Sequence, residues 1–317
     1  MSQAPDPTDA PPLVVKIGGA RAVDPAGVVG DIAHYAATGR SVVVVHGGST
    51  AVDDTLEALG KEPEYVETPA GVSGRFTDDE TLETFEMVLP GKLNTELVAH
   101  LRGVGVDAVG LSGVDGGLVT GPRKSAVRVV ENGTKKIRRG DHAGRPADLN
   151  TDLLESLLSD GYVPTVCPPM FADDGTVANA DADRVAALLA AELGADLVLL
   201  TDVAGVYADP EDEATLIKAA ETPAAMDDLE DAAEGFMSRK VHATREALEG
   251  GAGGVTIGDA GLRKPLVAAL TGHGTYVDPG AVGVETDGGV EQEPAVADDR
   301  LDCGIDAADI AALGGND

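Results

Sequence analysis

The chain has 317 residues, of which 43% are hydrophobic and 3% aromatic, and it carries a formal net charge of −32. This composition is typical of a globular protein and not of a disordered one, and the length allows one large domain or two smaller ones. The charge argues against nucleic acid as a partner. Because the excess carboxylates are spread along the chain, we expect a halophilic protein adapted to a high-salt cytoplasm.

The ends of the chain and its cysteines limit the possibilities further. No apolar run approaches 18 residues and residues 1–12 do not resemble a signal peptide, so we expect a flexible tail on a soluble cytoplasmic protein that does not enter a membrane. Two cysteines, Cys167 and Cys303, cannot form a disulfide framework or a metal cluster.

The first 46 residues predict a strand, a helix and a second strand. The run LVVKI at 13–17 is apolar apart from one lysine, which is typical of a buried parallel strand. A helix should begin at Asp24-Pro25 and end before Gly39, and the apolar run at 41–46 follows it. This order predicts a right-handed βαβ unit.

The next segment predicts helices and then a basic hairpin. Thr77 and Glu80 should form a capping box for a helix that Pro90 kinks or ends. Residues 123–145 hold eight basic residues against two acidic ones, in a chain that is otherwise acidic. Within them, Asn132-Gly133 lies between two alternating runs, which is a strong hairpin signal. The alternation places Lys136 and Arg138 on one face of the second strand.

After residue 150 helices and strands alternate again. Together with the first half, this favours an α/β protein, a three-layer αβα sandwich with a mainly parallel central sheet. The expected divisions are a tail (1–12), an N-terminal lobe (13–180), a C-terminal lobe (181–280) and an acidic extension (281–317). The role of the extension is not evident from its sequence.

Several residues are candidates for chemistry. Two glycine pairs follow the first two buried strands, where a parallel sheet binds ligands and where glycine lets backbone N–H groups approach phosphate; they also fit ordinary tight turns. Lys16 lies in a buried strand and should face an anion or a carboxylate. Lys240 is either a second lysine of the site or a solvated helix residue, and Arg75 is either a fork for a carboxylate or a surface arginine. The N-x-D-x-D stretch from Asn179 to Asp183 could hold a metal, orient lysines or simply cap a helix.

Taken together, the motifs of residues 13–279 resemble the amino-acid kinase fold, and within it the N-acetylglutamate kinase branch. The resemblance is carried by VVKIGGA, VVHGGS, SGRFTDDETLE with MVLPGKLNTELV, NADADRVAALLAAELGADLVLLTDVAGVY, and GFMSRKV. It implies an enzyme that transfers the γ-phosphoryl group of ATP to a carboxylate, with Mg²⁺ held by the nucleotide and no metal ligand from the protein. Positioning and charge neutralisation then provide the catalysis, without a covalent nucleophile or a general base.

The resemblance also implies a role for each candidate. Lys16 and Lys240 would stabilise the transferred phosphoryl group, and Asp183 would orient both lysines. Arg75 and Asn179 would bind the acceptor. Gly18, Gly19, Gly47 and Gly48 would supply N–H groups to the nucleotide phosphates and the acceptor carboxylate. The stretch 201–210 would line the nucleoside pocket with Thr201, Asp202, Val206 and Tyr207. The resemblance thus implies that the N-terminal lobe (13–180) binds the amino-acid or carrier substrate and that the C-terminal lobe (181–280) binds nucleotide.

Two features are similar to the kinases that act on amino acids attached to the acidic carrier protein LysW. The first is Asp181 in the middle of the N-x-D-x-D stretch, and the second is the basic hairpin. The resemblance implies a face that docks this carrier, formed by Arg128, Lys135, Lys136, Arg138 and Arg139. Alternatively, these side chains pair with acids of the same chain.

The activity predicted is therefore that of a kinase for LysW-bound glutamate, aminoadipate or both, with acetylglutamate kinase as the alternative. A sensor without activity is a third possibility, but retention of Lys16, Asp183 and Lys240 argues against it. In the family that the sequence resembles, the feedback-inhibited acetylglutamate kinases have an extra N-terminal helix. Only about twelve Pro-rich residues precede the first strand here, so we expect a homodimer and no arginine-sensitive ring.

Overall fold

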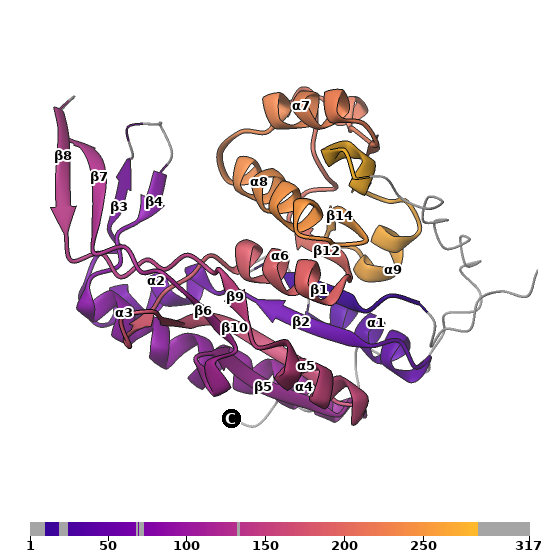
Figure 1. Cartoon of the computed structure of the whole chain (residues 1–317), viewed down its shortest axis with the longest axis horizontal. Coiled ribbons are helices and arrows are strands. Elements are labelled where there is room, and N and C mark those ends of the chain that lie inside the picture. The colour runs from indigo at the N-terminus through magenta and orange to yellow at the C-terminus, as the bar shows by residue number, and fades with distance from the viewer. Residues whose placement is uncertain (1–9, 19–24, 68, 70–72, 132–133, 285–317) are drawn as a thin grey trace, which may run out of the picture.

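The computed structural model describes residues 10–18, 25–67, 69, 73–131 and 134–284 (Figure 1). Gly19, the Asn132-Gly133 turn, Cys303 and nearly all of the two predicted tails lie outside these residues. Within the described part, no helix is long and apolar enough to cross a membrane.

Eleven of the described strands form one sheet, in which β1 (Leu13–Ile17) lies between β2 (Val42–His46) and β12 (Asp196–Thr201). These pairings are parallel, as are those of β2 with β10 and of β12 with β14. The sheet therefore runs without interruption across residue 180, where the sequence predicted a boundary between lobes. Its other strands are β5 (Ala108–Gly113), β6 (Val119–Gly121), β9 (Asp148–Leu149), β10 (Val163–Ala172), β11 (Val177–Ala178), β13 (Ala219–Ala220), β14 (Gly254–Asp259) and β15 (Thr275–Val277).

Helices cover both faces of this sheet, which confirms the predicted three-layer architecture (Figure 1). Alternate residues of β1 belong to different cores, because successive side chains of a strand point to opposite faces. Val14 packs with the helices α5 (Thr151–Ser159), α6 (Ala182–Leu193) and α8 (Gly235–Glu249). Leu13 and Val15 pack with α1 (Pro25–Ala37), α4 (Thr95–Gly103) and α9 (Pro265–Leu270). The helix α7 (Pro223–Ala232) adds Met226 and Leu229 to the first core.

The helical segment after residue 77 differs from the sequence prediction in two ways. The helix α3 (Asp79–Glu86) is capped by Asp78, whose side chain accepts the N–H of Thr81, so the predicted Thr77 capping box is wrong. Thr77 is instead buried, and its N–H donates to the Asp141 carboxylate at 3.2 Å. Pro90 does not end the helix either, because a π-helical segment, Met87–Asn94, carries the chain around it and on into α4.

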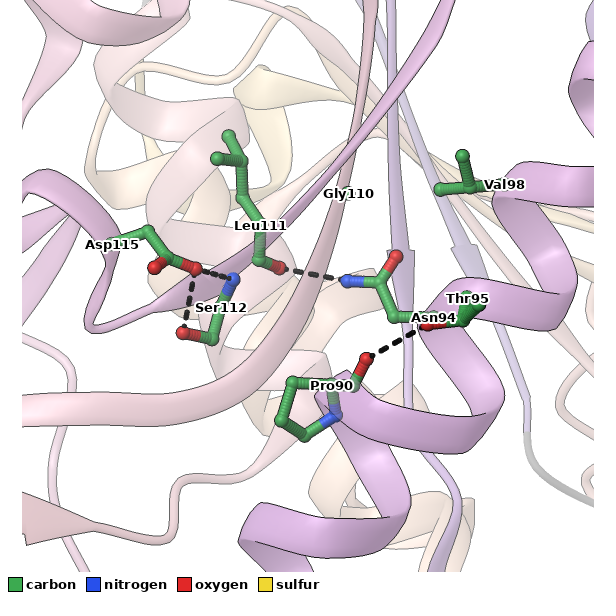
Figure 2. A pocket seen from close by; sticks show the side chains of 8 residues that line it. All are labelled: Pro90, Asn94, Thr95, Val98, Gly110, Leu111, Ser112 and Asp115. Carbon is green, nitrogen blue, oxygen red and sulfur yellow. Dashed lines mark hydrogen bonds between the residues drawn. The ribbon is translucent and has the colours of Figure 1, made fainter.

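A pocket of about 330 Å³ lies between this π-helical segment, α4 and β5 (Figure 2). Asn94 fixes the π-helical segment to the sheet by donating to the carbonyls of Leu111 and Thr165, at 3.0 and 3.1 Å. None of the predicted site residues lines this pocket.

Two hairpins stand side by side away from the sheet (Figure 1). One pairs β3 (Tyr65–Glu67) with β4 (Ser73–Arg75), and the other pairs β7 (Ala126–Glu131) with β8 (Thr134–Arg139). The second confirms the predicted basic hairpin.

Candidate active site

The centre of the site is one buried carboxylate between two lysines. Asp183 Oδ1 lies 2.6 Å from Lys16 Nζ, and Asp183 Oδ2 lies 2.9 Å from Lys240 Nζ. Lys16 shares the face of β1 that packs against α6 and α8, the helices that carry the other two residues. The structure therefore brings together three side chains that lie far apart in the sequence.

Hydrogen bonds at the N-terminus of α6 orient Asp183 toward the two lysines. Asp181 is the N-cap of α6, and its carboxylate accepts the N–H groups of Asp183 and Arg184, at 2.9 and 3.3 Å. Arg184 then forms an ion pair with Glu246 at 2.5 Å, which joins α6 to α8. The helix that bears Lys240 is thus held against the helix that bears Asp183.

Burial and charge act against each other in this trio. Each of its residues is less than 10% exposed. Burial would raise the pKa of Asp183, but the two ammonium groups hold it well below its usual value. Burial lowers the pKa of Lys16, and the attraction of Asp183 outweighs this and raises it. The pKa of Lys240 is lowered, by burial first and then by the charge of Lys16. The trio carries one net positive charge when fully ionised, which suits an anion.

The glycines after β1 and β2 allow close packing at the ends of these strands. A Cβ on Gly18 would lie 2.8 Å from the Leu200 carbonyl oxygen, to which the Gly18 N–H donates at 3.0 Å. That N–H is therefore used within the fold, and the contact of Gly18 with a phosphate stays a prediction. Gly48 is the N-cap of α2 (Ser49–Ala58), and a Cβ there would lie 2.3 Å from Leu93 Cδ1.

Gly47 lies beside the start of α6, where its added Cβ would be 3.6 Å from Ala182 Cβ. The N-termini of α2 and α6 thus lie near one another through Gly47 and Gly48, and their partial positive charges favour an anion there.

Arg75 lies at the end of β4, where polar and aromatic side chains contact it. Its guanidinium forms an ion pair with Asp53 and donates to the Tyr65 hydroxyl at 2.7 Å and to the Ser49 carbonyl at 3.3 Å. It also lies over the rings of Tyr65 and Phe85, 4.9 and 5.5 Å from their centroids. The side chain is pre-oriented by these contacts, and an acceptor carboxylate would have to share it with Asp53.

Asn179 precedes α6 and offers an unused acceptor. Its backbone is fixed, since its N–H donates to the His142 carbonyl at 2.9 Å and its own carbonyl accepts the Gly144 N–H at 2.6 Å. Its side-chain oxygen is buried and has no hydrogen-bond partner. A donor on a ligand would satisfy it.

The residues predicted to contact nucleotide differ in how well they are placed. Thr201 ends β12, where its hydroxyl donates to Asp202 at 3.1 Å, and Tyr207 pairs with Leu216 in an isolated bridge. Val206 is 1% exposed; its N–H donates to Thr275 Oγ1, and its carbonyl accepts from Ile217. Val206 therefore supports the loop from within the core, and its contact with nucleotide stays a prediction.

Four of the five predicted docking residues of the basic hairpin are exposed: Arg128, Lys135, Lys136 and Arg139. The fifth, Arg138, pairs with both oxygens of Glu64 and lies 4.0 Å over the ring centroid of Phe76. Its guanidinium is therefore used within the chain, which is the alternative that the sequence left open for these cations.

Asp53, Tyr65 and His46 were missed by the sequence reasoning. Asp53 and Tyr65 contact Arg75 and each other, with the Tyr65 hydroxyl 3.0 Å from Asp53 Oδ2. His46 ends β2, and burial lowers its pKa although its Nδ1 lies 3.0 Å from the Gly47 carbonyl. VVVVH followed by Gly-Gly was a usable signal for His46, whereas nothing in the sequence near Asp53 or Tyr65 marked them.

Known families and proteins resemble this chain over most of its length. The model of the amino acid kinase family matches residues 11–259. A [LysW]-aminoadipate kinase from Deinococcus radiodurans is 46% identical over 269 residues, covering 84% of this chain and 91% of that one. An acetylglutamate kinase from Methanopyrus kandleri is 40% identical over 270 residues, with 83% and 99% covered.

Among solved structures, the N-acetylglutamate synthase of Neisseria gonorrhoeae has a TM-score of 0.67 at 24% identity. The match covers 84% of this chain and 59% of that one, and it shows a shared fold.

Proposed function

The chain belongs to the amino acid kinase family, and from this premise we propose that it phosphorylates the side-chain carboxylate of aminoadipate, glutamate or both while the amino acid is attached to LysW. The donor is ATP and the product is an acyl phosphate, as required in lysine or arginine biosynthesis. The relative from Deinococcus radiodurans, named for this reaction, supports the choice of acceptor. The observation that carries the proposal is the contact of Asp183 with both Lys16 and Lys240.

In the proposed reaction a carboxylate oxygen forms a bond to the γ-phosphorus of ATP while the bond from that phosphorus to the ADP oxygen breaks. Two anions must approach one another, and negative charge is spread over the equatorial oxygens. Lys16 and Lys240 would neutralise this charge from a strand and a helix on the same side of the sheet. Asp183 keeps both ammonium groups charged and fixed, which is the preorganisation that such a transfer needs.

The roles proposed for the other residues rest on the resemblance of their motifs to the family. Arg75 and Asn179 would bind the acceptor, with Gly47 and Gly48 at its reacting carboxylate. Thr201, Asp202 and Tyr207 would line the nucleotide site, so residues 13–180 serve mainly the acceptor and residues 181–280 the nucleotide. These three nucleotide residues all lie on β12 or in the loop that follows it.

Mg²⁺ is proposed to arrive on the nucleotide phosphates. Both oxygens of Asp183 already contact ammonium groups, so this carboxylate does not fit as a ligand of the metal. The metal would supply further neutralisation of the phosphate charge.

The exposed cations of β7 and β8 are proposed to dock the acidic carrier. They project from a hairpin that stands beside the hairpin of Arg75 (Figure 1). The carrier's globular part would rest on the basic hairpin while the attached amino acid reaches Arg75. High salt shortens the range of charge attraction, so close arginine contacts from Arg128 and Arg139 should contribute most.

A phosphate-transfer assay tests the function. ADP release is measured in molar KCl, as suits a halophilic cytoplasmic enzyme, with LysW-linked aminoadipate, LysW-linked glutamate or free N-acetylglutamate as the acceptor. We expect turnover with one or both carrier-linked substrates. Turnover with N-acetylglutamate alone would favour an acetylglutamate kinase, the alternative that the Methanopyrus kandleri relative supports.

Charge reversal tests the docking surface separately. Changing Lys135, Lys136 and Arg139 to Glu should raise KM for the carrier-linked acceptor. The control is Arg102→Glu, at an exposed arginine of α4 that pairs with Asp107. Equal KM values in the two variants would refute docking at this hairpin. Sedimentation of the wild type tests the proposed homodimer.

A further inference from the structure

Arg138 joins the two hairpins at their bases. It lies on β8, and its guanidinium holds the Glu64 carboxylate through two nitrogens, one of them at 2.6 Å, while its plane covers the Phe76 ring. Bidentate pairing and aromatic stacking both depend on the planar fork of arginine, and a lysine cannot reproduce them together.

The two residues that Arg138 holds form the base of the other hairpin. The Phe76 N–H donates to the Glu64 carbonyl at 2.9 Å, and the next pair in the register is Tyr65 with Arg75. Arg138 therefore contacts Glu64 and Phe76, the pair directly next to Tyr65 and Arg75 in the register. Arg75 is the residue of this hairpin that is proposed to bind the acceptor.

The strand that carries Arg138 is itself anchored to the same segment. The His142 N–H donates to the Thr77 carbonyl at 2.8 Å, and the buried Asp141 carboxylate accepts the Thr77 N–H. Phe76 and Thr77, which directly follow Arg75, are thus connected to the end of the basic hairpin through both side-chain and backbone contacts. We therefore expect a displacement of one hairpin to move the other.

We propose that Arg138 is a positioning residue of the acceptor site, which transmits the position of the docked basic hairpin to Arg75. This inference rests on the proposed function. Arg138 contributes little by attracting the carrier itself, because its charge is already paired with Glu64. It acts instead by setting where Arg75 lies when the attached amino acid arrives.

The test separates kcat from KM in four proteins: wild type, Arg138→Gln, Arg138→Lys and Arg139→Gln. Arg139 is the adjacent arginine, exposed and on the opposite face of β8. Arg138→Gln should lower kcat by about 10- to 100-fold, since small displacements of a positioning group cost this much. Arg138→Lys should lower kcat nearly as far although it keeps the charge. Arg139→Gln should raise KM for the carrier-linked acceptor with kcat retained.

Amide hydrogen exchange of residues 73–77 provides a readout that does not need activity. Exchange should be faster in Arg138→Gln than in the wild type. It should be unchanged in Arg102→Gln, a control that breaks the ion pair of another surface arginine with Asp107. Unchanged exchange in Arg138→Gln, or an effect confined to KM, would overturn the proposed role. If the wild type phosphorylates none of the acceptors, the proposed function fails, and the exchange result still decides whether Arg138 fixes this hairpin.

Discussion

Replacing Asp183 by Asn removes the one carboxylate that two buried ammonium groups share, and we expect a large loss of stability. Lys16 and Lys240 are 6% and 9% exposed, so water cannot take the place of the carboxylate. Removing one partner of a buried ion pair costs about 3–5 kcal/mol. Alternatively, Lys240 can lose its proton in the variant. Bringing a lysine from its ordinary pKa to below 7 costs about 4–5 kcal/mol, so either outcome lowers the free energy of unfolding by a similar amount.

Thermal unfolding of wild type and Asp183→Asn in the same molar KCl buffer measures this loss. A cost of 3–5 kcal/mol corresponds to a fall in Tm of about 5–9 °C for a domain of this size. The folded-state pKa of Asp183 is below its ordinary value, so its stabilisation is full above pH 4 and is lost as the pH falls through the folded pKa. The difference between the two proteins should therefore shrink in acid. A variant within 1 kcal/mol of wild type at pH 7 that also retains its kcat would refute the reasoning.

Three further predictions follow from other contacts. Lys16→Met should lower kcat about 100- to 1000-fold with little loss of Tm, because Asp183 keeps Lys240 as a partner; an assay of ADP release with a melting curve checks both. Gly48→Ala should destabilise the chain by about 1–3 kcal/mol, measured by denaturant unfolding, because the new methyl group meets Leu93 and the buried Leu89. Burial raises the pKa of Asp31 to about 6. Stability from this group should therefore fall by up to about 3 kcal/mol as the pH rises from 4 to 6, and Asp31→Asn should remove that dependence in unfolding titrations.

The elements that the sequence predicted best are those whose pattern is set by burial. The apolar runs at 13–17 and 41–46 are central strands, where both faces are covered and few other residues would fit. The expectation that Lys16 faces a carboxylate is confirmed. It also followed from burial, because an unpaired ammonium inside a buried strand would be too costly.

What the sequence did not predict depends on contacts between segments. Alternation in β8 assigns side chains to two faces, but it does not say that one face meets a second hairpin, so the pairing of Arg138 with Glu64 was missed. The capping of α3 by Asp78 instead of Thr77 depends on one residue of register, because both are good N-cap types. Asp53 is one of many helix-surface acids in this chain, and only the fold shows that it contacts Arg75.

The shared carboxylate at the junction of β1, α6 and α8 has a consequence for how this lineage can diverge. A duplicated copy that lost either lysine would keep an ionised partner for Asp183, whereas one that lost Asp183 first would leave two cations buried against each other. Mutational paths toward a copy without activity should therefore begin at a lysine and reach the aspartate last.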